Sequence, residues 1–243
     1  MLEIKILTAY PEIFPGTLGY SILGKALEEK KWSLDIVNLH DFGIDERKNI
    51  DDEPFGGGPG MVIRADVVEN ALLSIDYPKD LKRQLIYLTP SGKPLKQSNL
   101  LEFIEFNQLI ILCGRFEGVD ERAIKILNFM EFSIGDYVLV GGEIASQVLV
   151  EGCIRLLPGV LGQPESLLEE SFSSNLLEYP QYTRPQVWKD AQNNDHDVPK
   201  ILLSGHHEKI KEWRKDKSIK KTQLVRPDLL EQKKKTGIKQ WRT

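Results

Sequence analysis

Cysteine is scarce in this 243-residue chain, which contains only Cys113 and Cys153, each within an apolar run. Two thiols cannot form the disulfide framework of a small secreted domain, so a reducing compartment is expected. The first five residues include two charges, where a signal peptide needs an apolar stretch. The apolar run after Asp136 is interrupted by Glu143 and is too short to span a membrane. We therefore expect a cytoplasmic protein with no membrane segment.

Several common site motifs are also absent. No Gly-x-Gly-x-x-Gly stretch opens a helix and no Gly-x-x-x-x-Gly-Lys-Ser/Thr stretch occurs, which argues against an ordinary dinucleotide site and a nucleoside-triphosphatase loop. His206 and His207 are adjacent and cannot face one metal ion from a helix, and the two cysteines are far away in the sequence. We predict no metal site built from protein side chains alone.

Charge is distributed unevenly along the chain. The net charge is −4, yet residues 171–243 contain 16 Lys and Arg against 9 Asp and Glu, and residues 1–170 contain 16 against 27. The acidic and basic parts suggest two modules, and the basic one suits a polyanion such as nucleic acid. A solvated, Lys-rich helical surface explains the same charge, so this asymmetry alone does not establish a partner.

The hydrophobic pattern alternates between strands and helices over the first two thirds of the chain. This order predicts an α/β domain with a parallel sheet covered on both faces. Predicted strands are Leu2–Thr8, Trp32–Leu39, Gln84–Leu88 and Gln108–Cys113, and predicted helices are Ser21–Lys30, Val62–Ser74 and Asp136–Leu157. We expect residues 1–161 to form this domain, 162–174 a linker, and 175–243 a smaller, basic, mostly helical domain.

Three glycine-containing segments, 88–92, 112–122 and 133–143, are predicted to lie where strands of the sheet end. Open α/β sheets bind their ligands at this edge, and glycine lets the backbone approach a ligand closely. One such loop is usually only a tight turn. Three of them in one chain favour a shared small-molecule pocket.

The stretch 51–61 contains three consecutive glycines, which cost backbone entropy and are unusual in a simple turn. They suit either a flexible lid over a substrate or a cradle of bare amides around an anion. Acidic residues nearby disfavour a phosphate, unless Arg47 and Lys48 offset them. We interpret the stretch as a substrate lid.

Nine short motifs carry a resemblance to a known family: Gly56–Met61, Cys113–Gly118, Asp120–Arg122, Ile134–Leu139, Pro158–Leu161, Pro180–Pro185, Ser204–His207, Trp213–Arg214 and Arg226–Leu229. In this order they resemble the bacterial tRNA (guanine-N1)-methyltransferases. The match is colinear from the first strand to about residue 230, so it covers nearly the whole chain.

The resemblance implies a SPOUT-class enzyme, in which a deep trefoil knot of the α/β domain binds S-adenosyl-L-methionine. It implies a homodimer with active sites at the subunit interface, and methylation of N1 of the guanine on the 3′ side of the anticodon in tRNA, assisted by Mg²⁺. The basic C-terminal part would then bind tRNA phosphates through Lys209, Lys211, Arg214, Lys215, Lys217, Lys220 and Lys221.

Site residues follow from the same resemblance. The cofactor-binding positions are Leu88, Thr89, Pro90, Gly92, Gly114, Glu117, Ile134, Gly135, Asp136, Tyr137, Val138, Leu139 and Gly142. The substrate-binding positions are Asp51, Gly56, Gly57, Gly58, Arg184, Ser204, His206, Trp213 and Arg214. Phe55 and Phe116 stand where the family commonly has tyrosine.

Two residues are assigned to the chemistry. Arg155 matches the family's catalytic arginine and suits stabilisation of charge on guanine O6, while Glu170 matches the aspartate that removes the N1 proton. Glutamate is one methylene longer, and Glu169 is an alternative base. A chain of this fold that binds RNA but has lost turnover is one competing hypothesis. A knotted methyltransferase of ribosomal RNA is another, which the colinear C-terminal part disfavours.

Overall fold

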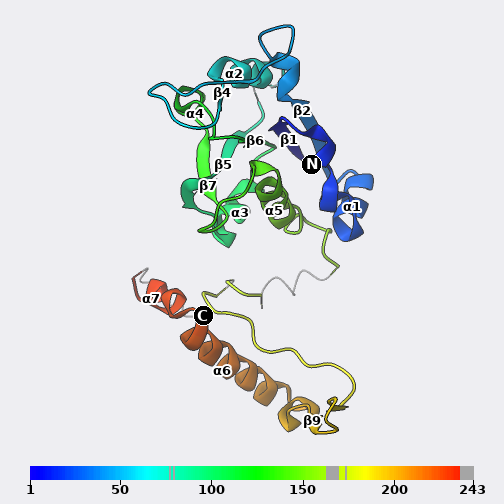
Figure 1. Cartoon of the computed structure of the whole chain (residues 1–243). Helices are drawn as coiled ribbons and strands as arrows, with labels where there is room; N and C mark the ends of the chain where they lie inside the picture. Colours follow the sequence, from blue (N-terminus) through cyan, green and yellow to red (C-terminus); the bar gives the residue numbers. More distant parts are fainter. Residues whose placement is uncertain (77, 79, 163–169, 173, 236–243) are drawn as a thin grey trace. The chain divides into compact units, whose positions relative to one another are not determined.

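Five parallel strands form the centre of the first of two compact units, Met1–Gly162, in the order β2-β1-β6-β5-β7 (Figure 1). The structure is a computed structural model and describes residues 1–76, 78, 80–162, 170–172 and 174–235. The five sheet strands are β1 (Leu2–Thr8), β2 (Trp32–Asn38), β5 (Arg83–Pro94), β6 (Gln108–Cys113) and β7 (Met130–Ser133). The helices are α1 (Ser21–Glu28), α2 (Ala65–Leu73), α3 (Gln97–Phe103), α4 (Glu121–Ile126) and α5 (Gly142–Ile154).

Helices cover both faces of this sheet, as the sequence predicts. Along β6, Leu109, Ile111 and Cys113 belong to the core cluster shared with α1, α3 and α5. The alternate residues Ile110 and Leu112 belong to the cluster shared with α2 and α4. Because successive side chains of a strand point to opposite faces, a fully apolar strand is buried on both sides.

Four predicted element boundaries are wrong by three residues or more, one of them the end of the helix expected over Asp136–Leu157, which lies at Ile154. The helix expected over Asp136–Leu157 begins only at Gly142, because residues 134–141 form a loop whose apolar side chains extend the hydrophobic run without being helical. The helix expected from Val62 begins at Ala65, since Val62–Ile63 is strand β4, which pairs with β3 (Asp51–Asp52). The strand expected to end at Leu88 continues to Pro94.

The extension of β5 contains an irregularity. Both Leu88 and Lys93 pair with Phe132 of β7, so residues 89–92 bulge out between them. Gly92 lies against β7 so closely that a Cβ atom would be 2.5 Å from the Phe132 backbone nitrogen. The predicted loop 88–92 is therefore an excursion within a strand and not a segment that follows one.

The second unit, Gln163–Thr243, contains α6 (His207–Val225), α7 (Pro227–Lys235) and a two-stranded sheet of β8 (Val187–Lys189) and β9 (Asp195–Asp197). An extended segment runs along α6: the Leu177 amide donates to the Thr222 hydroxyl at 2.8 Å, and the Arg214 guanidinium lies 4.7 Å from the centre of the Tyr179 ring. The segments expected to be helical include 236–243, which lie outside the described residues.

Among the helices that the structure describes, none is both long and apolar enough to cross a membrane.

Candidate active site

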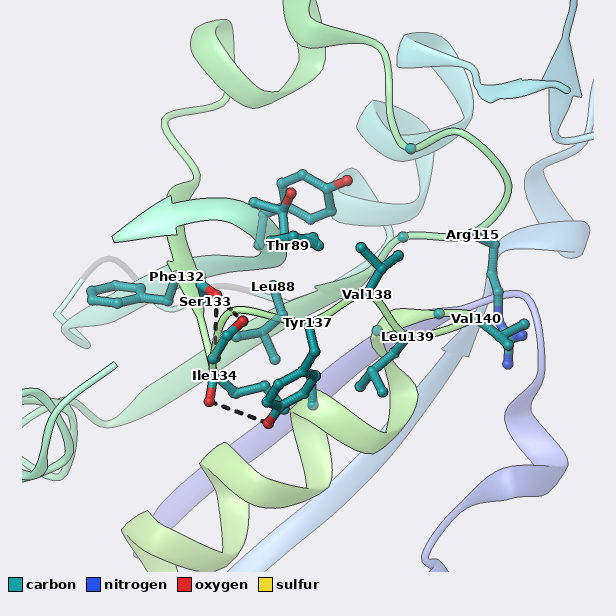
Figure 2. Close-up of a pocket in the computed structure, with 18 of the residues that line it drawn as sticks. Leu88, Thr89, Arg115, Phe132, Ser133, Ile134, Tyr137, Val138, Leu139 and Val140 are labelled. Carbon is teal, nitrogen blue, oxygen red and sulfur yellow. Dashed lines mark hydrogen bonds between the residues drawn. The ribbon is translucent and has the colours of Figure 1, made fainter. Parts of the chain in front are cut away.

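A pocket of about 240 Å³ lies at the carboxyl ends of β5, β6 and β7 (Figure 2). Its walls come from the bulge of β5, the loop after β6 and the loop between β7 and α5. These are the three glycine-containing segments that the sequence predicts to form one pocket. The structure therefore confirms that they meet.

Eleven of the thirteen predicted cofactor-binding residues line this pocket: Leu88, Thr89, Pro90, Gly114, Glu117, Ile134, Gly135, Tyr137, Val138, Leu139 and Gly142. The other two do not. Gly92 packs against β7, and Asp136 is exposed on the loop before α5. Sequence reasoning missed three lining residues, Tyr87, Phe132 and Ala145. Six others lie within the predicted segments but were not named individually: Arg115, Phe116, Gly118, Ser133, Val140 and Gly141.

Gly114 and Gly142 are required by close packing at the pocket. A Cβ atom on Gly114 would lie 2.8 Å from the Tyr87 hydroxyl oxygen, and one on Gly142 would lie 2.8 Å from the Cys113 Cα atom. The Gly142 amide donates to the Gly114 carbonyl at 2.9 Å, which ties the first turn of α5 to the loop after β6. Glycine at both positions therefore allows this close packing beside the pocket.

The loop between β7 and α5 is held by its own hydrogen bonds. The Ser133 hydroxyl donates to the Gly135 carbonyl at 3.0 Å, and the Gly135 amide donates back to that hydroxyl at 3.2 Å. The Tyr137 hydroxyl donates to the Ile134 carbonyl at 3.3 Å, as Figure 2 shows. These hydrogen bonds give the loop a defined shape.

A buried ion pair supports the pocket wall. Only 2% of the Glu143 side chain is exposed; its Oε2 atom lies 2.9 Å from Arg115 Nε, and its Oε1 atom accepts a 2.8 Å hydrogen bond from the Thr8 hydroxyl. The Arg115 guanidinium also lies over the Tyr10 ring, 4.4 Å from its centre. A carboxylate in an otherwise apolar run was the sequence signal for this pair, because a buried charge needs a partner.

The cysteines have no part in nucleophilic chemistry here. Burial raises the pKa of the Cys113 thiol, with the nearby Glu143 charge as a second cause, and burial raises the pKa of Cys153 to about 12. Both side chains are therefore neutral thiols near pH 7, whereas a reactive cysteine needs a lowered pKa.

The glycine-rich loop 53–60 is attached to the pocket at Glu117. The Glu117 amide donates to the Met61 carbonyl at 2.9 Å, and a Cβ atom on Gly60 would lie 2.5 Å from Glu117 Cγ. Of the predicted substrate-binding residues, Asp51 lies in β3 opposite Ile63. The predicted Gly56, Gly57 and Gly58 lie in the exposed part of the loop.

No group of three or more His, Cys, Asp or Glu side chains in the described parts of the chain could hold a metal ion. The described residues therefore offer no preformed cluster for Mg²⁺, an ion that proteins usually hold through one or two carboxylates together with substrate oxygens.

Arg155 and Glu170, the predicted catalytic residues, lie in different units. Arg155 is the half-buried C-cap of α5, where its amide donates to the Glu151 carbonyl at 3.1 Å. Glu170 is half-buried and directly precedes a turn in which the Phe172 amide donates to the Leu176 carbonyl at 2.8 Å. The alternative base, Glu169, lies outside the described residues.

The remaining predicted substrate-binding residues belong to the second unit. Ser204 and His206 lie together before α6, where the Ser204 hydroxyl accepts a hydrogen bond from the His206 amide at 3.3 Å. Trp213 and Arg214 lie further along α6, and the Trp213 ring is half-buried, with its centre 6.3 Å from that of Tyr182. Arg184 is exposed in the extended segment before β8.

The doubly covered parallel sheet, with a preformed pocket across the carboxyl ends of three neighbouring strands, places the first unit in the class of open α/β ligand-binding proteins. The sequence then gives the family. Residues 2–232 match the model of the family described as tRNA (Guanine-1)-methyltransferase TrmD, and the chain belongs to this family.

Curated relatives agree with this assignment. The chain is 51% identical over 227 residues to a tRNA (guanine-N(1)-)-methyltransferase of Ruegeria sp. (strain TM1040), a match covering 93% of this chain and 91% of the relative. It is 50% identical to a protein of the same name from Rhodospirillum rubrum, with 94% and 92% covered. It is 45% identical to one from Ehrlichia ruminantium (strain Gardel), with 94% and 95% covered.

Proposed function

We propose that this protein transfers a methyl group from S-adenosyl-L-methionine to N1 of the guanine on the 3′ side of the anticodon in tRNA. Family membership over residues 2–232 is the observation that carries the proposal. The family also leads us to propose that the loops 88–92, 114–117 and 134–139 belong to a trefoil knot of the SPOUT class. Because tRNA is the substrate, the proposed activity is cytoplasmic.

The residues of the pocket suit adenosylmethionine. The volume of the pocket, about 240 Å³, lies just below the range of about 300–1,000 Å³ that is usual for small-molecule pockets. Gly114 and Gly142 allow the close packing that shapes the pocket, and Leu88, Ile134 and Leu139 add apolar walls that suit an adenine ring. When bound, adenosylmethionine supplies an electrophilic methyl carbon on a sulfonium.

In the proposed mechanism, the Glu170 carboxylate accepts the proton from guanine N1. The N1 lone pair then forms a bond to the methyl carbon, and the electron pair of the breaking C–S bond remains on sulfur. The Arg155 guanidinium stabilises the negative charge that develops on O6. General-base removal of the proton is needed because protonated N1 is a poor nucleophile.

We further propose that two copies of the chain form a homodimer and that Arg155 and Glu170 serve one site from different copies. Val138 and Val140 are exposed over 83% and 85% of their surface, and Ile144 and Val148, one turn apart on the outer face of α5, are exposed as well. Such an apolar surface beside the pocket suits an interface between two copies.

The shared site predicts complementation between two inactive chains. Mixing Arg155→Ala with Glu170→Gln in equal amounts, after chain exchange, is expected to restore about a quarter of wild-type activity, since half of the dimers in a two-fold assembly would have one intact site. Steady-state methylation measures the recovery, and differently tagged chains verify the exchange. A fully exchanged mixture as inactive as its parents would contradict the shared site.

The basic surface of α6 predicts a steep salt dependence of tRNA binding. Lys209, Lys211 and Lys215 are exposed on this helix. If they contact phosphates, replacing all three by alanine should reduce the magnitude of the slope of log affinity against log salt by about 2.1–2.7, since each contact contributes about 0.7–0.9. Filter binding across a salt series measures the slope.

The matched control removes the same charge from the first unit, through Lys25→Ala, Lys82→Ala and Lys125→Ala together. An equal effect of this control would show that net charge, not α6, determines the slope.

The function itself is tested by transfer of labelled methyl groups to tRNA transcripts with guanine or adenine at the position beside the anticodon. We expect label in the guanine transcript alone. Binding of both ligands without transfer would support the catalytically impaired alternative. Absence of adenosylmethionine binding by the folded protein would refute the enzyme.

A further inference from the structure

Phe55 is exposed over 98% of its surface, an unusual state for an aromatic side chain. It lies in a turn that the Gly57 amide closes by donating to the Pro54 carbonyl at 3.2 Å. Phe55 occupies the second position of this turn. We propose that the Phe55 ring stacks on the base of a nucleotide adjoining the target guanine, an inference that rests on the proposed function.

The position of the loop connects this ring to the pocket. The loop ends at Gly60 and Met61, which pack against and hydrogen-bond to Glu117 of the pocket wall. A guanine whose N1 reaches the pocket must leave its two neighbouring nucleotides outside the rim. Phe55, six residues before Met61, lies within reach of such a neighbour.

The glycines after Phe55 give the loop freedom to bring the ring onto a base. Gly56, Gly57 and Gly58 have φ values of +91°, +78° and +128°, and a Cβ atom on any of them would meet nothing within 4 Å. Close packing therefore does not account for the glycines, whereas the backbone conformation does. The loop is fixed at its start, where Arg64 Nη1 forms a 3.0 Å ion pair with Asp52 Oδ2.

Charge selects a base over a phosphate as the partner of Phe55. The segment just before the ring contains Asp51, Asp52 and Glu53, and Arg64 partners only one of these acids in the described structure. Carboxylates repel the phosphate backbone, while the uncharged face of a base stacks on an aromatic ring whatever its sequence. The geometry thus points to stacking and not to a backbone contact.

A mutant cycle tests the contact. Phe55→Ala is expected to weaken tRNA binding about tenfold, as expected for loss of one base–aromatic stack, whereas Phe55→Tyr should bind like wild type. Transcripts assembled with an abasic nucleotide on either side of the target guanine identify the partner. At the stacked position the abasic site should weaken wild-type binding about tenfold and leave Phe55→Ala unchanged.

Controls separate this inference from other roles of the ring and from the proposed function. Leu73→Ala, which truncates another exposed apolar side chain of the first unit, should bind tRNA normally. Equal losses from both abasic sites in wild type and Phe55→Ala would overturn the inference. The inference would also be overturned if Phe55→Ala bound tRNA normally and instead lost adenosylmethionine affinity, measured by calorimetry, or dimerisation, measured by sedimentation. Wild-type methylation of the unmodified transcript tests the proposed function independently.

Discussion

Glu170→Gln is expected to lower the single-turnover rate of methyl transfer by about 10²–10⁴-fold, the usual contribution of a general base. Glutamine keeps the shape of the side chain but cannot accept the N1 proton. Adenosylmethionine and tRNA affinities should change little, because the carboxylate acts in the chemical step. Single-turnover measurements at saturating tRNA isolate that step from product release.

Two further variants give this experiment its controls. Glu170→Asp restores the residue that the family resemblance assigns to this position and should retain most activity, whereas Glu169→Gln should have a small effect. If Glu169→Gln abolished activity and Glu170→Gln did not, the base would be Glu169. Near-wild-type rates for all three variants would mean that neither carboxylate removes the proton.

Glu143→Ala is expected to destabilise the first unit by about 3–5 kcal/mol, the typical cost of removing one partner from a buried ion pair. The substitution leaves Arg115, whose side chain is only 16% exposed, without its carboxylate and removes the acceptor of the Thr8 hydroxyl. Urea unfolding followed by circular dichroism measures the loss as a lower midpoint at unchanged slope.

The control for this prediction lies on the same helix. Glu151→Ala removes an exposed carboxylate from α5 and should change the free energy of unfolding by no more than about 0.5 kcal/mol. In the double variant Arg115→Ala/Glu143→Ala, the loss should be smaller than the sum of the single losses, because no charge is left buried alone. Additive losses would show that the pair does not act as a unit.

Sequence reasoning located the ends of strands that are short, mostly apolar runs. It misplaced the start of a helix that is preceded by exposed apolar residues. The strands Leu2–Thr8 and Gln108–Cys113 were predicted to the residue, because each is a short, mostly apolar run, although only the second is buried along its whole length. The helix predicted from Asp136 began six residues too early, because the exposed Val138 and Val140 continue the hydrophobic run into α5.

The candidate site divides in the same way. Glycine-containing segments at the ends of strands were enough to predict one pocket, because parallel strands bring their carboxyl ends to one edge. The partner of Glu143 was not predictable, since Arg115 and Thr8 lie 28 and 135 positions away in the sequence. The roles of Arg155 and Glu170 came only from the family resemblance, because spacing alone left both as surface residues.

The bulge in β5 has a consequence for the thermodynamics of ligand binding. Residues 89–92 lie between Leu88 and Lys93, which both pair with Phe132. The neighbouring loop is held by the hydrogen bonds of Ser133 and Tyr137. Segments already held at both ends lose little conformational entropy when a ligand arrives. The pocket is therefore preorganised, and ligand contacts contribute to the free energy of binding with little loss of conformational entropy in the chain.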